Sequence, residues 1–301
     1  MIAPLPFTIP HPERLRTDEP LARHTAVRLG GPADWLYIAQ ESVEELEAVV
    51  SAAWAAGFPL TVLGGGANVL ISDAGVRGLV VINAVTAVSF NAEIVTVSAG
   101  HGLSKLARKC AASGLAGLEW AASIPGTVGG SVVNNAGAHG GDIAGCLVSA
   151  DVLDARHGRR TLRVGDLAYG YRTSALKAQL DRRFLVLAAT FRLQPGDPAA
   201  SAARIDEVVA YRKRTQPPGA SLGSIFKNPP GDYAGRLIES CGLKGLTVGG
   251  AQVSPVHANF FINRGGATAS DYNALIDQVQ AAVLAATGFR LETEIERMGA
   301  W

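Results

Sequence analysis

The chain has 301 residues, of which 48% are hydrophobic and 18% charged, a composition typical of a globular protein with enough core for two domains. Its 27 Lys and Arg residues nearly balance 26 Asp and Glu residues, and the net charge of +1 argues against a nucleic-acid-binding protein. The N-terminal stretch has no basic start and is interrupted by Pro4, Pro6 and Pro10, so we expect no secretory signal. No uncharged apolar run approaches the roughly 18 residues of a membrane span, so none is expected.

Three cysteines, Cys110, Cys146 and Cys241, are scattered along the chain and do not pair at metal-ligand spacing. An odd, scattered set suits reduced thiols, so we expect a cytoplasmic protein in which each cysteine is a small core residue rather than a nucleophile. The six histidines form no H-E-x-x-H motif and no close pair, so the sequence predicts no metal site.

The predicted elements begin with a helix over 42–57, in which Ser42 is the N-cap, Glu45 completes a capping box and Gly57 ends the helix. A short apolar strand over 59–63 then leads into three consecutive glycines. Two further strands are predicted over 78–85 and 93–100, followed by a helix over 102–114 that stops at Gly114. A strong strand covers Arg183–Leu193.

The segment QPGDPAA, Gln194 to Ala200, contains two prolines and a glycine without apolar periodicity, so it predicts a linker and a domain boundary near residue 198. A helix follows over 203–218. The segment 257–289 is typical of a strand, a turn and a helix, and 291–299 predicts a closing strand. Strands and helices are interleaved without a strict βαβ rhythm, which indicates a mixed α/β or α+β class.

The three glycines, Gly64 to Gly66, are followed by Ala67 and Asn68. They do not form the G-x-G-x-x-G fingerprint and lack the lysine and Ser/Thr of a Walker loop. A plain turn needs one or two glycines, whereas three glycines and an asparagine suit a nest of backbone N–H groups that holds an anion. The spacing alone favours neither interpretation.

A second glycine-rich stretch, SIPGTVGGSVVNNAGAHGGD, runs from Ser123 to Asp142 and contains six glycines. Pro125 and Gly126 predict a turn, and Thr127 can donate a hydroxyl hydrogen. Two loops of this type in one half of a protein suit a diphosphate between them better than two unrelated turns. They therefore favour a bound dinucleotide.

Two stretches place polar side chains beside turn residues. In YGYRTS, Tyr171 precedes Arg172, and an arginine after a tight glycine turn could clamp a carboxylate, although a surface arginine fits the same spacing. In GSIFKNPPG, Ser224, Lys227 and Asn228 lie among glycines and prolines. The G-x-S-x-G nucleophile elbow is absent, so this serine does not indicate a hydrolase.

Two further groups are ambiguous on their own. In a strand over LETEIE, alternation would put Glu292, Glu294 and Glu296 on one face, which could be a solvated face or part of a site. His257, in VSPVHANFF, could be structural or functional.

Six collinear stretches together resemble the family of UDP-N-acetylenolpyruvoylglucosamine reductases: LGGGANVLISD, IPGTVGGSVVNNAGAHGGD, YGYRTSAL, GSIFKNPPGDYAGRLIESCGLKG, GGAQVSPVHANFFIN and LETEIERMG. The resemblance runs from about His24 to Gly299 and includes TAVRLGGPADWL near the start. Several of these motifs are individually specific, and they occur in the family's order.

The resemblance implies an α+β fold with a two-lobed FAD-binding domain, similar to that of vanillyl-alcohol oxidase (the PCMH type), and a smaller α+β substrate-binding domain. Mapped onto this chain, it gives an N-terminal extension over 1–22, an FAD domain over 23–197 with lobes at about 23–85 and 86–197, and a substrate domain over 198–301. It implies non-covalent FAD, NADPH as reductant and an enolpyruvyl UDP-sugar as the only other partner, with a monomer expected.

The implied reaction converts UDP-N-acetylglucosamine enolpyruvate to UDP-N-acetylmuramate, a cytoplasmic step of peptidoglycan synthesis that serves cell-wall biogenesis, cell shape and cell division. By motif match, Arg172 and Glu294 bind the enolate-like intermediate and Ser224 donates the proton. Because two adjacent carboxylates repel each other, Glu294 is expected to be protonated or paired with Arg172.

The same match assigns the binding residues. The substrate-binding residues are Tyr171, Lys227, Asn228, His257 and Asn259. The cofactor-binding residues are Gly64, Gly65, Gly66, Ala67, Asn68, Ser123, Ile124, Gly126, Thr127, Gly130 and Asn135.

The chain departs from the family pattern at several positions. Ala67 stands where many relatives have serine, and Asn134 and His139 stand where an apolar residue and a tyrosine are usual. A Tyr-bearing loop between Arg172 and Ser224 is missing, so the chain resembles the shorter subtype. Two alternatives stay open: another FAD enzyme of this fold, such as a sugar or alcohol oxidase with flavin tethered through His101, and a non-catalytic nucleotide-binding module.

Overall fold

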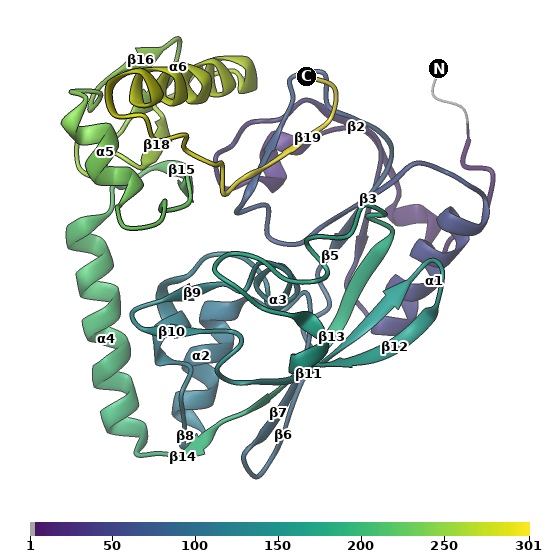
Figure 1. Ribbon diagram of the computed structural model, residues 1–301. Coiled ribbons are helices and arrows are strands. Elements are labelled where there is room, and N and C mark those ends of the chain that lie inside the picture. Colours follow the sequence, from purple (N-terminus) through teal and green to yellow (C-terminus); the bar gives the residue numbers. More distant parts are fainter. Residues whose placement is uncertain (1–3) are drawn as a thin grey trace. The chain divides into compact units, whose positions relative to one another are not determined.

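The computed structural model describes residues 4–301, and residues 1–3 of the predicted N-terminal extension lie outside the described residues (Figure 1). In the described chain the helices are α1 (Val43–Ala55), α2 (Leu103–Ala112), α3 (Val128–Asn134), α4 (Pro198–Thr215), α5 (Ala234–Ser240), α6 (Ala269–Thr287) and the 3-10 helices η1 (Pro12–Arg14), η2 (Leu21–His24), η3 (Glu119–Ser123) and η4 (Val164–Leu167). The strands are β1 (Arg16–Pro20), β2 (Pro32–Ala39), β3 (Leu60–Leu63), β4 (Val69–Ile71), β5 (Val76–Asn83), β6 (Val88–Asn91), β7 (Ile94–Ser98), β8 (Leu115–Ala116), β9 (Gly137–Ala138), β10 (Gly141–Asp142), β11 (Leu147–Asp154), β12 (Gly158–Arg163), β13 (Phe184–Arg192), β14 (Gln194–Pro195), β15 (Ala220–Ser224), β16 (Thr247–Val248), β17 (Ala251–Val253), β18 (Phe260–Asn263) and β19 (Glu296–Met298).

The chain folds into two compact units, and neither is a continuous stretch of sequence. The first unit contains the chain up to Thr17, Trp35–Gly65 and Gly78–Tyr211. The second contains Asp18–Asp34, Gly66–Arg77 and Arg212–Trp301. The predicted boundary near residue 198 and the last boundary of the compact units, after Tyr211, do not coincide. The mixture of helices and sheets in both units confirms the predicted α+β class.

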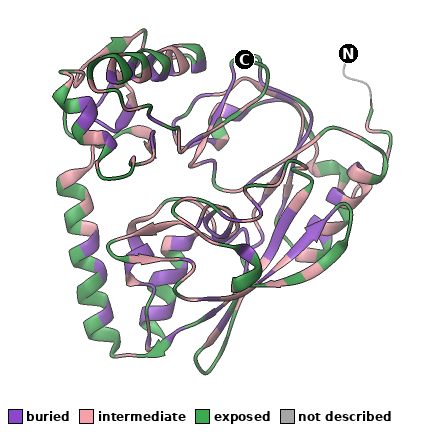
Figure 2. Cartoon of the chain, viewed as in Figure 1, coloured by how far each residue is buried: buried purple, intermediate pink, exposed green. Residues whose placement is uncertain are grey.

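The first unit is built around a five-stranded antiparallel sheet of order β12-β11-β13-β7-β6. Its core contains Phe191 of β13, Val97 of β7, Leu106 of α2 and Val132 of α3, all buried. Figure 2 shows the buried positions along these strands and helices, whereas β6 is largely exposed. Burial of this apolar surface holds the short helix α3 on the sheet.

Helix α1 and the parallel strands β3 and β5 form a second core in the same unit. Leu60 of β3 pairs with Leu79 of β5, and the two strands stay in register up to Leu63 and Ile82. The buried face of α1 carries Leu46, Val49, Val50 and Ala53, which recur at helical spacing. This core holds the end of β3, from which the first two glycines of the run, Gly64 and Gly65, continue.

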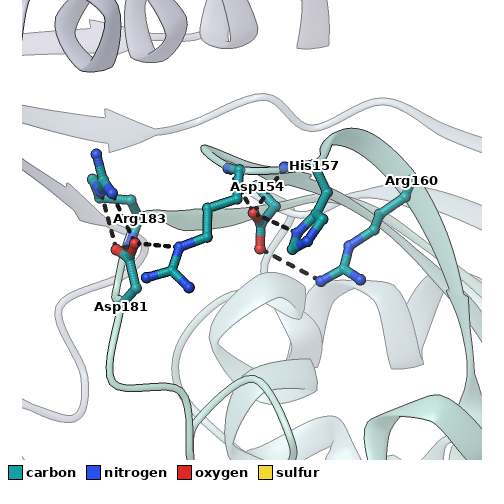
Figure 3. A network of polar contacts seen from close by, with 6 residues as sticks. Asp154, His157, Arg160, Asp181 and Arg183 are labelled. Atoms are coloured by element: carbon teal, nitrogen blue, oxygen red, sulfur yellow. Dashed lines mark hydrogen bonds and ion pairs between the residues drawn. The ribbon is translucent and has the colours of Figure 1, made fainter.

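Carboxylates close the turn between β11 and β12 (Figure 3). Asp154 accepts hydrogen bonds from the backbone N–H of Arg156 at 2.8 Å and from the ring Nδ1 of His157 at 3.1 Å, and it also contacts Arg160. Burial acts to raise the pKa of Asp154, but these hydrogen bonds outweigh it and hold the pKa below its usual value. The Asp181 carboxylate accepts hydrogen bonds from the guanidinium groups of Arg183 and Arg156.

The second unit contains an antiparallel sheet of order β15-β18-β17-β16, with α6 packed against β16 and β17 and α5 packed against α6. Phe226, Phe261 and Tyr272 are buried in its core, and the rings of Phe226 and Phe261 meet edge to face with centroids 6.0 Å apart. Strand β19 pairs in parallel with β4, from Glu296–Val69 to Met298–Ile71. The segment after the glycine run is therefore part of this unit.

Most of the helix predictions from the sequence are confirmed. Ser42 is the N-cap of α1 and accepts a hydrogen bond from the Glu45 N–H at 3.1 Å. The predicted capping box is wrong, because the Glu45 carboxylate accepts from the N–H groups of Gln40 and Glu41 instead. Gly57 ends the helix with a φ of 61°.

Two predicted segments differ from the structure. The predicted linker at Gln194–Ala200 is wrong, because β14 occupies its start and α4 begins at Pro198. Of the predicted closing strand, only Glu296–Met298 is a strand, so Glu292 and Glu294 lie in irregular chain before it. Helices α3 and α5 were not predicted.

Two features are absent from the described residues, 4–301. In that range no helix is both long and apolar enough to cross a membrane. The same range contains no group of three or more His, Cys, Asp and Glu side chains arranged to hold a metal ion.

Candidate active site

The two glycine-rich loops meet within the first unit. A Cβ added to Gly65 would lie 3.1 Å from the Cα of Gly126, and one added to Gly64 would overlap the Thr127 side chain. The second loop is fixed from behind by Leu103, whose N–H donates to the Gly126 carbonyl at 3.1 Å. The glycines therefore allow two backbones to approach each other closely.

The rest of the glycine run belongs to the second unit. Gly66 has a φ of 58°, and its carbonyl accepts a hydrogen bond from the Ala26 N–H at 2.9 Å. The Asn68 side-chain amide donates to the Glu294 carbonyl at 3.1 Å, and the Asn68 carbonyl accepts from the Glu296 N–H at 2.9 Å. Asn68 is thus bound to the backbone on both sides of Ile295.

The predicted cofactor residues of these loops fit a diphosphate. The eleven residues include no acidic side chain, so none would repel phosphate. Thr127 is the N-cap of α3, and the following Gly130 is exposed; an added Cβ there would meet only the Thr127 hydroxyl oxygen, at 3.7 Å. Where the two loops meet in the first unit, small residues and the open position at Gly130 thus allow the close approach that a dinucleotide requires.

Asn135 has protein partners for all of its side-chain polar atoms. Its Nδ2 donates to Asp142 at 3.2 Å and to the Gly170 carbonyl at 3.1 Å, and its Oδ1 accepts from the Ala144 N–H at 3.0 Å. The residue is 5% exposed and adopts a left-handed φ of 45° at the end of α3. In this arrangement Asn135 ties the Gly170 turn to α3.

Arg172 lies in a tight turn closed by reciprocal backbone hydrogen bonds between Gly170 and Thr173. Its own φ is 54°, a conformation that costs a non-glycine residue about 1 kcal/mol. The guanidinium donates to the carbonyls of Asn135, at 3.4 Å, and Gly137, at 2.8 Å, and its Cζ is 5.6 Å from the ring centroid of the exposed Tyr171. Hence the arginine is held in a defined position by backbone at the end of α3.

The segments that carry Ser224 and Glu294 pair with each other in the second unit, although 70 positions separate the two residues in the sequence. The Glu294 N–H donates to the Ile225 carbonyl at 2.8 Å, and Phe226 forms an isolated bridge with Thr293. Ser224 immediately precedes this pairing, at the end of β15 and after Gly223, whose φ is 76°. The structure thus pairs the backbone segments that carry the predicted proton donor and the predicted carboxylate.

Lys227 and Asn228 continue the same segment. The Lys227 N–H donates to the Glu292 carbonyl at 2.9 Å, and its ammonium pairs with the Glu292 carboxylate. The Asn228 Oδ1 accepts from the Ala234 N–H at 3.1 Å, at the start of α5. Both residues therefore lie close to Ser224 in sequence and in space.

The predicted substrate residues Asn259 and His257 form hydrogen bonds that hold the backbone around Phe226. Asn259 is 3% exposed, and its side chain both accepts from the Phe226 N–H at 2.9 Å and donates to the Phe226 carbonyl at 2.8 Å. The His257 Nδ1 accepts from the Asn259 N–H at 3.2 Å, so the ring is neutral with its proton on Nε2. Burial lowers the pKa of His257.

His101, the residue considered for a covalent flavin, lies beside the second loop. It is 8% exposed, and its Nδ1 lies 2.9 Å from the Gly102 carbonyl. Because a carbonyl can only accept, Nδ1 carries the proton in this arrangement. The His101 carbonyl in turn accepts from the Val128 N–H at 2.9 Å, which fixes the first residue of α3.

Sequence analysis did not predict the residues that hold Arg172 in place. Tyr169 and Ser174 flank the arginine and donate hydrogen bonds to α3, and Lys177 reaches Asn134. Their spacing in YGYRTSALK follows neither a helical nor a strand period, so no periodic pattern indicates them. Only the position of α3, which was itself not predicted, makes their role visible.

The two loops, which suit a dinucleotide, fit an FAD-binding oxidoreductase. In agreement, residues 36–161 match the model of an FAD binding domain. Residues 214–298 match the model of the C-terminal domain of UDP-N-acetylenolpyruvoylglucosamine reductase.

Whole-chain comparisons agree. The reductase of Rubrobacter xylanophilus is 46% identical over 286 residues, which cover 94% of each chain, and that of Chloroflexus aurantiacus is 45% identical over 94% of this chain and 97% of its own. A crystal structure of the enzyme from Thermus caldophilus, MurB, superposes with a TM-score of 0.80 at 35% identity, covering 95% of this chain and all of that one. The chain belongs to the UDP-N-acetylenolpyruvoylglucosamine reductase family.

Proposed function

We propose that the chain reduces the enolpyruvyl group of UDP-N-acetylglucosamine enolpyruvate to give UDP-N-acetylmuramate, with NADPH as the reductant. FAD, held by the glycine-rich loops, supplies the hydride chemistry when bound. The reaction belongs to peptidoglycan precursor synthesis, and we place it in the cytoplasm with the protein acting as a monomer. We assign the FAD domain to 23–197 and the substrate domain to 198–301, with the extension over 1–22.

The observation that carries this proposal is the pairing of the Ser224 and Glu294 segments. After hydride addition to a vinyl group, negative charge develops beside the substrate carboxylate and a proton must reach carbon. Ser224 supplies that proton, and the neighbouring Glu294 helps to hold the reacting group. A serine is a weak acid, so a neighbouring group must support it, and the ammonium of Lys227, three residues further on in the sequence, is our candidate.

Arg172 supplies the positive charge that the developing enolate requires. Its backbone contacts to Asn135 and Gly137 limit its motion, so little reorganisation is needed during the reaction. Tyr171, Lys227, Asn228, His257 and Asn259 bind the substrate in this proposal. Asn259 does so by shaping the Phe226 backbone that it bonds on both sides.

One experiment tests the function directly. The purified chain should show the visible spectrum of oxidised flavin, and NADPH consumption should require the enolpyruvyl sugar nucleotide. NADPH consumption that needs only oxygen, with no effect of the sugar nucleotide, would contradict the proposal and favour an oxidase. A colourless protein that binds the nucleotide without consuming NADPH would indicate a binding module instead.

A further inference from the structure

The Arg172 turn is attached to helix α3 by a series of side-chain donors. Tyr169 Oη donates to the Val132 carbonyl at 2.8 Å, and Ser174 Oγ donates to the Val133 carbonyl at 2.6 Å. These acceptors are successive carbonyls in the last turn of α3, which have no partner within the helix. The turn therefore supplies hydrogen-bond donors to the last carbonyls of α3, and the same bonds hold the turn on the helix.

Lys177 completes this attachment. Its ammonium donates to the Asn134 Oδ1 at 2.6 Å, and its backbone N–H donates to the Ser174 Oγ at 3.1 Å. The Asn134 Nδ2 donates back along the helix to the Gly130 carbonyl at 2.9 Å. Lys177 is thus connected through Asn134 to the first turn of α3, next to the second glycine-rich loop.

Arg172 needs such support, because its left-handed φ of 54° is unfavourable for a residue with a side chain. The reciprocal hydrogen bonds between Gly170 and Thr173 are 3.2 and 3.3 Å long, at the weak end of the normal range. A hydrogen bond from a charged donor is stronger than a neutral one. Apart from the guanidinium of Arg172 itself, Lys177 is therefore the charged donor that links this segment to α3.

We propose that Lys177 and Asn134 are a positioning pair for the known reaction: they hold the Arg172 turn on α3, and the helix sets the place of the guanidinium relative to the second glycine-rich loop. Neither residue needs to touch the substrate for this. The inference rests on the role proposed for Arg172, and it adds two residues to which the sequence motifs assign no function.

The first test measures the turn itself, without any turnover. In the FAD-loaded protein, Lys177→Met should speed amide hydrogen exchange of the peptide 169–177 by about tenfold, because the turn opens more often. Asn134→Ala should have the same effect, and the double variant should exchange no faster than either single one. Lys109→Met, which removes an exposed lysine of α2, is the matched control and should leave this peptide unchanged.

The second test measures catalysis in two separate half-reactions by stopped-flow absorbance. Lys177→Met should slow reoxidation by the enolpyruvyl substrate about tenfold or more. The rate of reduction by NADPH and the FAD content should stay near those of the unmodified protein. In an Arg172→Met background, adding Lys177→Met should cause no further slowing, because the group to be positioned is gone.

The outcomes separate this inference from the proposed function. Unchanged exchange in both single variants, an additive effect in the Arg172→Met background, or loss of FAD from Lys177→Met would each overturn the positioning role. If Arg172→Met itself reoxidises normally, the proposed role of Arg172 is wrong, and the exchange measurement still decides whether the pair holds the turn. If Lys177→Met does not fold, Asn134→Ala carries both tests.

Discussion

Arg172 shows how one residue can be fixed by both its backbone and its side chain. Its backbone has a left-handed φ of 54° within a four-residue turn, and its guanidinium donates to two backbone carbonyls. A planar fork can serve two acceptors while keeping its charge available to a third group. An ammonium is a point charge and cannot reproduce this geometry.

Arg172→Lys should therefore reduce turnover more than substrate affinity. We expect kcat to fall by about tenfold or more, equivalent to ~1.4 kcal/mol of transition-state stabilisation, with a smaller change in KM. Steady-state kinetics with the enolpyruvyl substrate measures both values. The exposed Arg108→Lys on α2 is the control. Turnover equal to that of the unmodified protein would remove Arg172 from the catalytic residues.

Ser224→Ala should affect only the half-reaction that needs a proton. The substitution removes a hydroxyl with little change in volume, so FAD content and reduction by NADPH should stay unchanged. Reoxidation by the substrate should slow by orders of magnitude, which stopped-flow absorbance resolves.

Ser221→Ala, in the same strand, is the matched control for that variant. Equal slowing of both half-reactions would indicate a general structural defect. Unchanged reoxidation would mean that another group or water supplies the proton.

His257 should make the stability of the protein depend on pH. Burial lowers its pKa, so as the pH falls below about 6.5 the unfolded chain takes up a proton before the folded one does. The stability associated with neutral His257 is present above that pH and is lost as the pH falls towards the folded pKa. His257→Gln should flatten this slope by less than the ~1.4 kcal/mol per pH unit of one full proton. Urea unfolding between pH 7 and 5 measures it, and an unaltered slope would contradict the assignment.

At the scale of elements, the carboxylate of Asp73, which follows β4, binds the first turn of helix α6. Asp73 accepts from the N–H groups of Ala269 and Ser270, both at 2.8 Å, at the first turn of α6. Burial acts to raise the pKa of Asp73, but these bonds and the one from the Ser270 hydroxyl outweigh it and lower the pKa. The contact joins two segments that are almost 200 positions apart in the sequence.

Asp73→Ala should destabilise the second unit by about 1–2 kcal/mol, because two N–H groups of α6 lose their acceptor. Urea unfolding, followed by far-UV circular dichroism, gives the change in unfolding free energy. Ser270→Ala keeps both backbone bonds and removes only the hydroxyl bond, so its effect should be smaller. Equal effects of the two substitutions would show that the backbone bonds contribute little.

The elements that the sequence predicted correctly carry their own local signals. Helix α1 has Ser42 before it and Gly57 after it, and α6 ends at Gly288, so caps and periodicity were sufficient there. Helix α3 contains Gly129 and Gly130, which disfavour helix, and it is held by distant contacts such as the hydrogen bond from the Gly129 N–H to the Ala99 carbonyl. Contacts between residues so far apart in the sequence cannot be predicted from a short stretch of it.

For the candidate site too, the sequence motifs predicted individual residues but not the long-range contacts between them. Motifs located Arg172, Ser224 and Glu294, but the pairing of the segments that carry the last two depends on a bridge between Phe226 and Thr293 that no local pattern encodes. Asn135 and Asn259 were assigned to ligands by motif, and the structure shows them bonded to backbone. Their ligand roles remain predictions.

For the whole molecule, the cofactor should be bound without a covalent link. The loops offer backbone and small residues, and the His101 ring is nearly buried beside the Gly102 carbonyl. Unfolding in guanidinium followed by ultrafiltration should therefore release all the yellow colour into the filtrate, read by flavin absorbance. Colour that stays with the polypeptide would show a tether and favour the oxidase alternative.

The interleaving of the two units has a consequence for cutting the chain. The backbone passes from one unit to the other after Thr17, Asp34, Gly65, Arg77 and Tyr211. A protease nick near Tyr211 would therefore not liberate a self-sufficient fragment, because Val27, Leu29 and Leu70 pack in the same core as Phe261 and Tyr272. The two pieces should co-purify in native buffer and separate only in denaturant, and genes split at this point should give a working enzyme only by complementation.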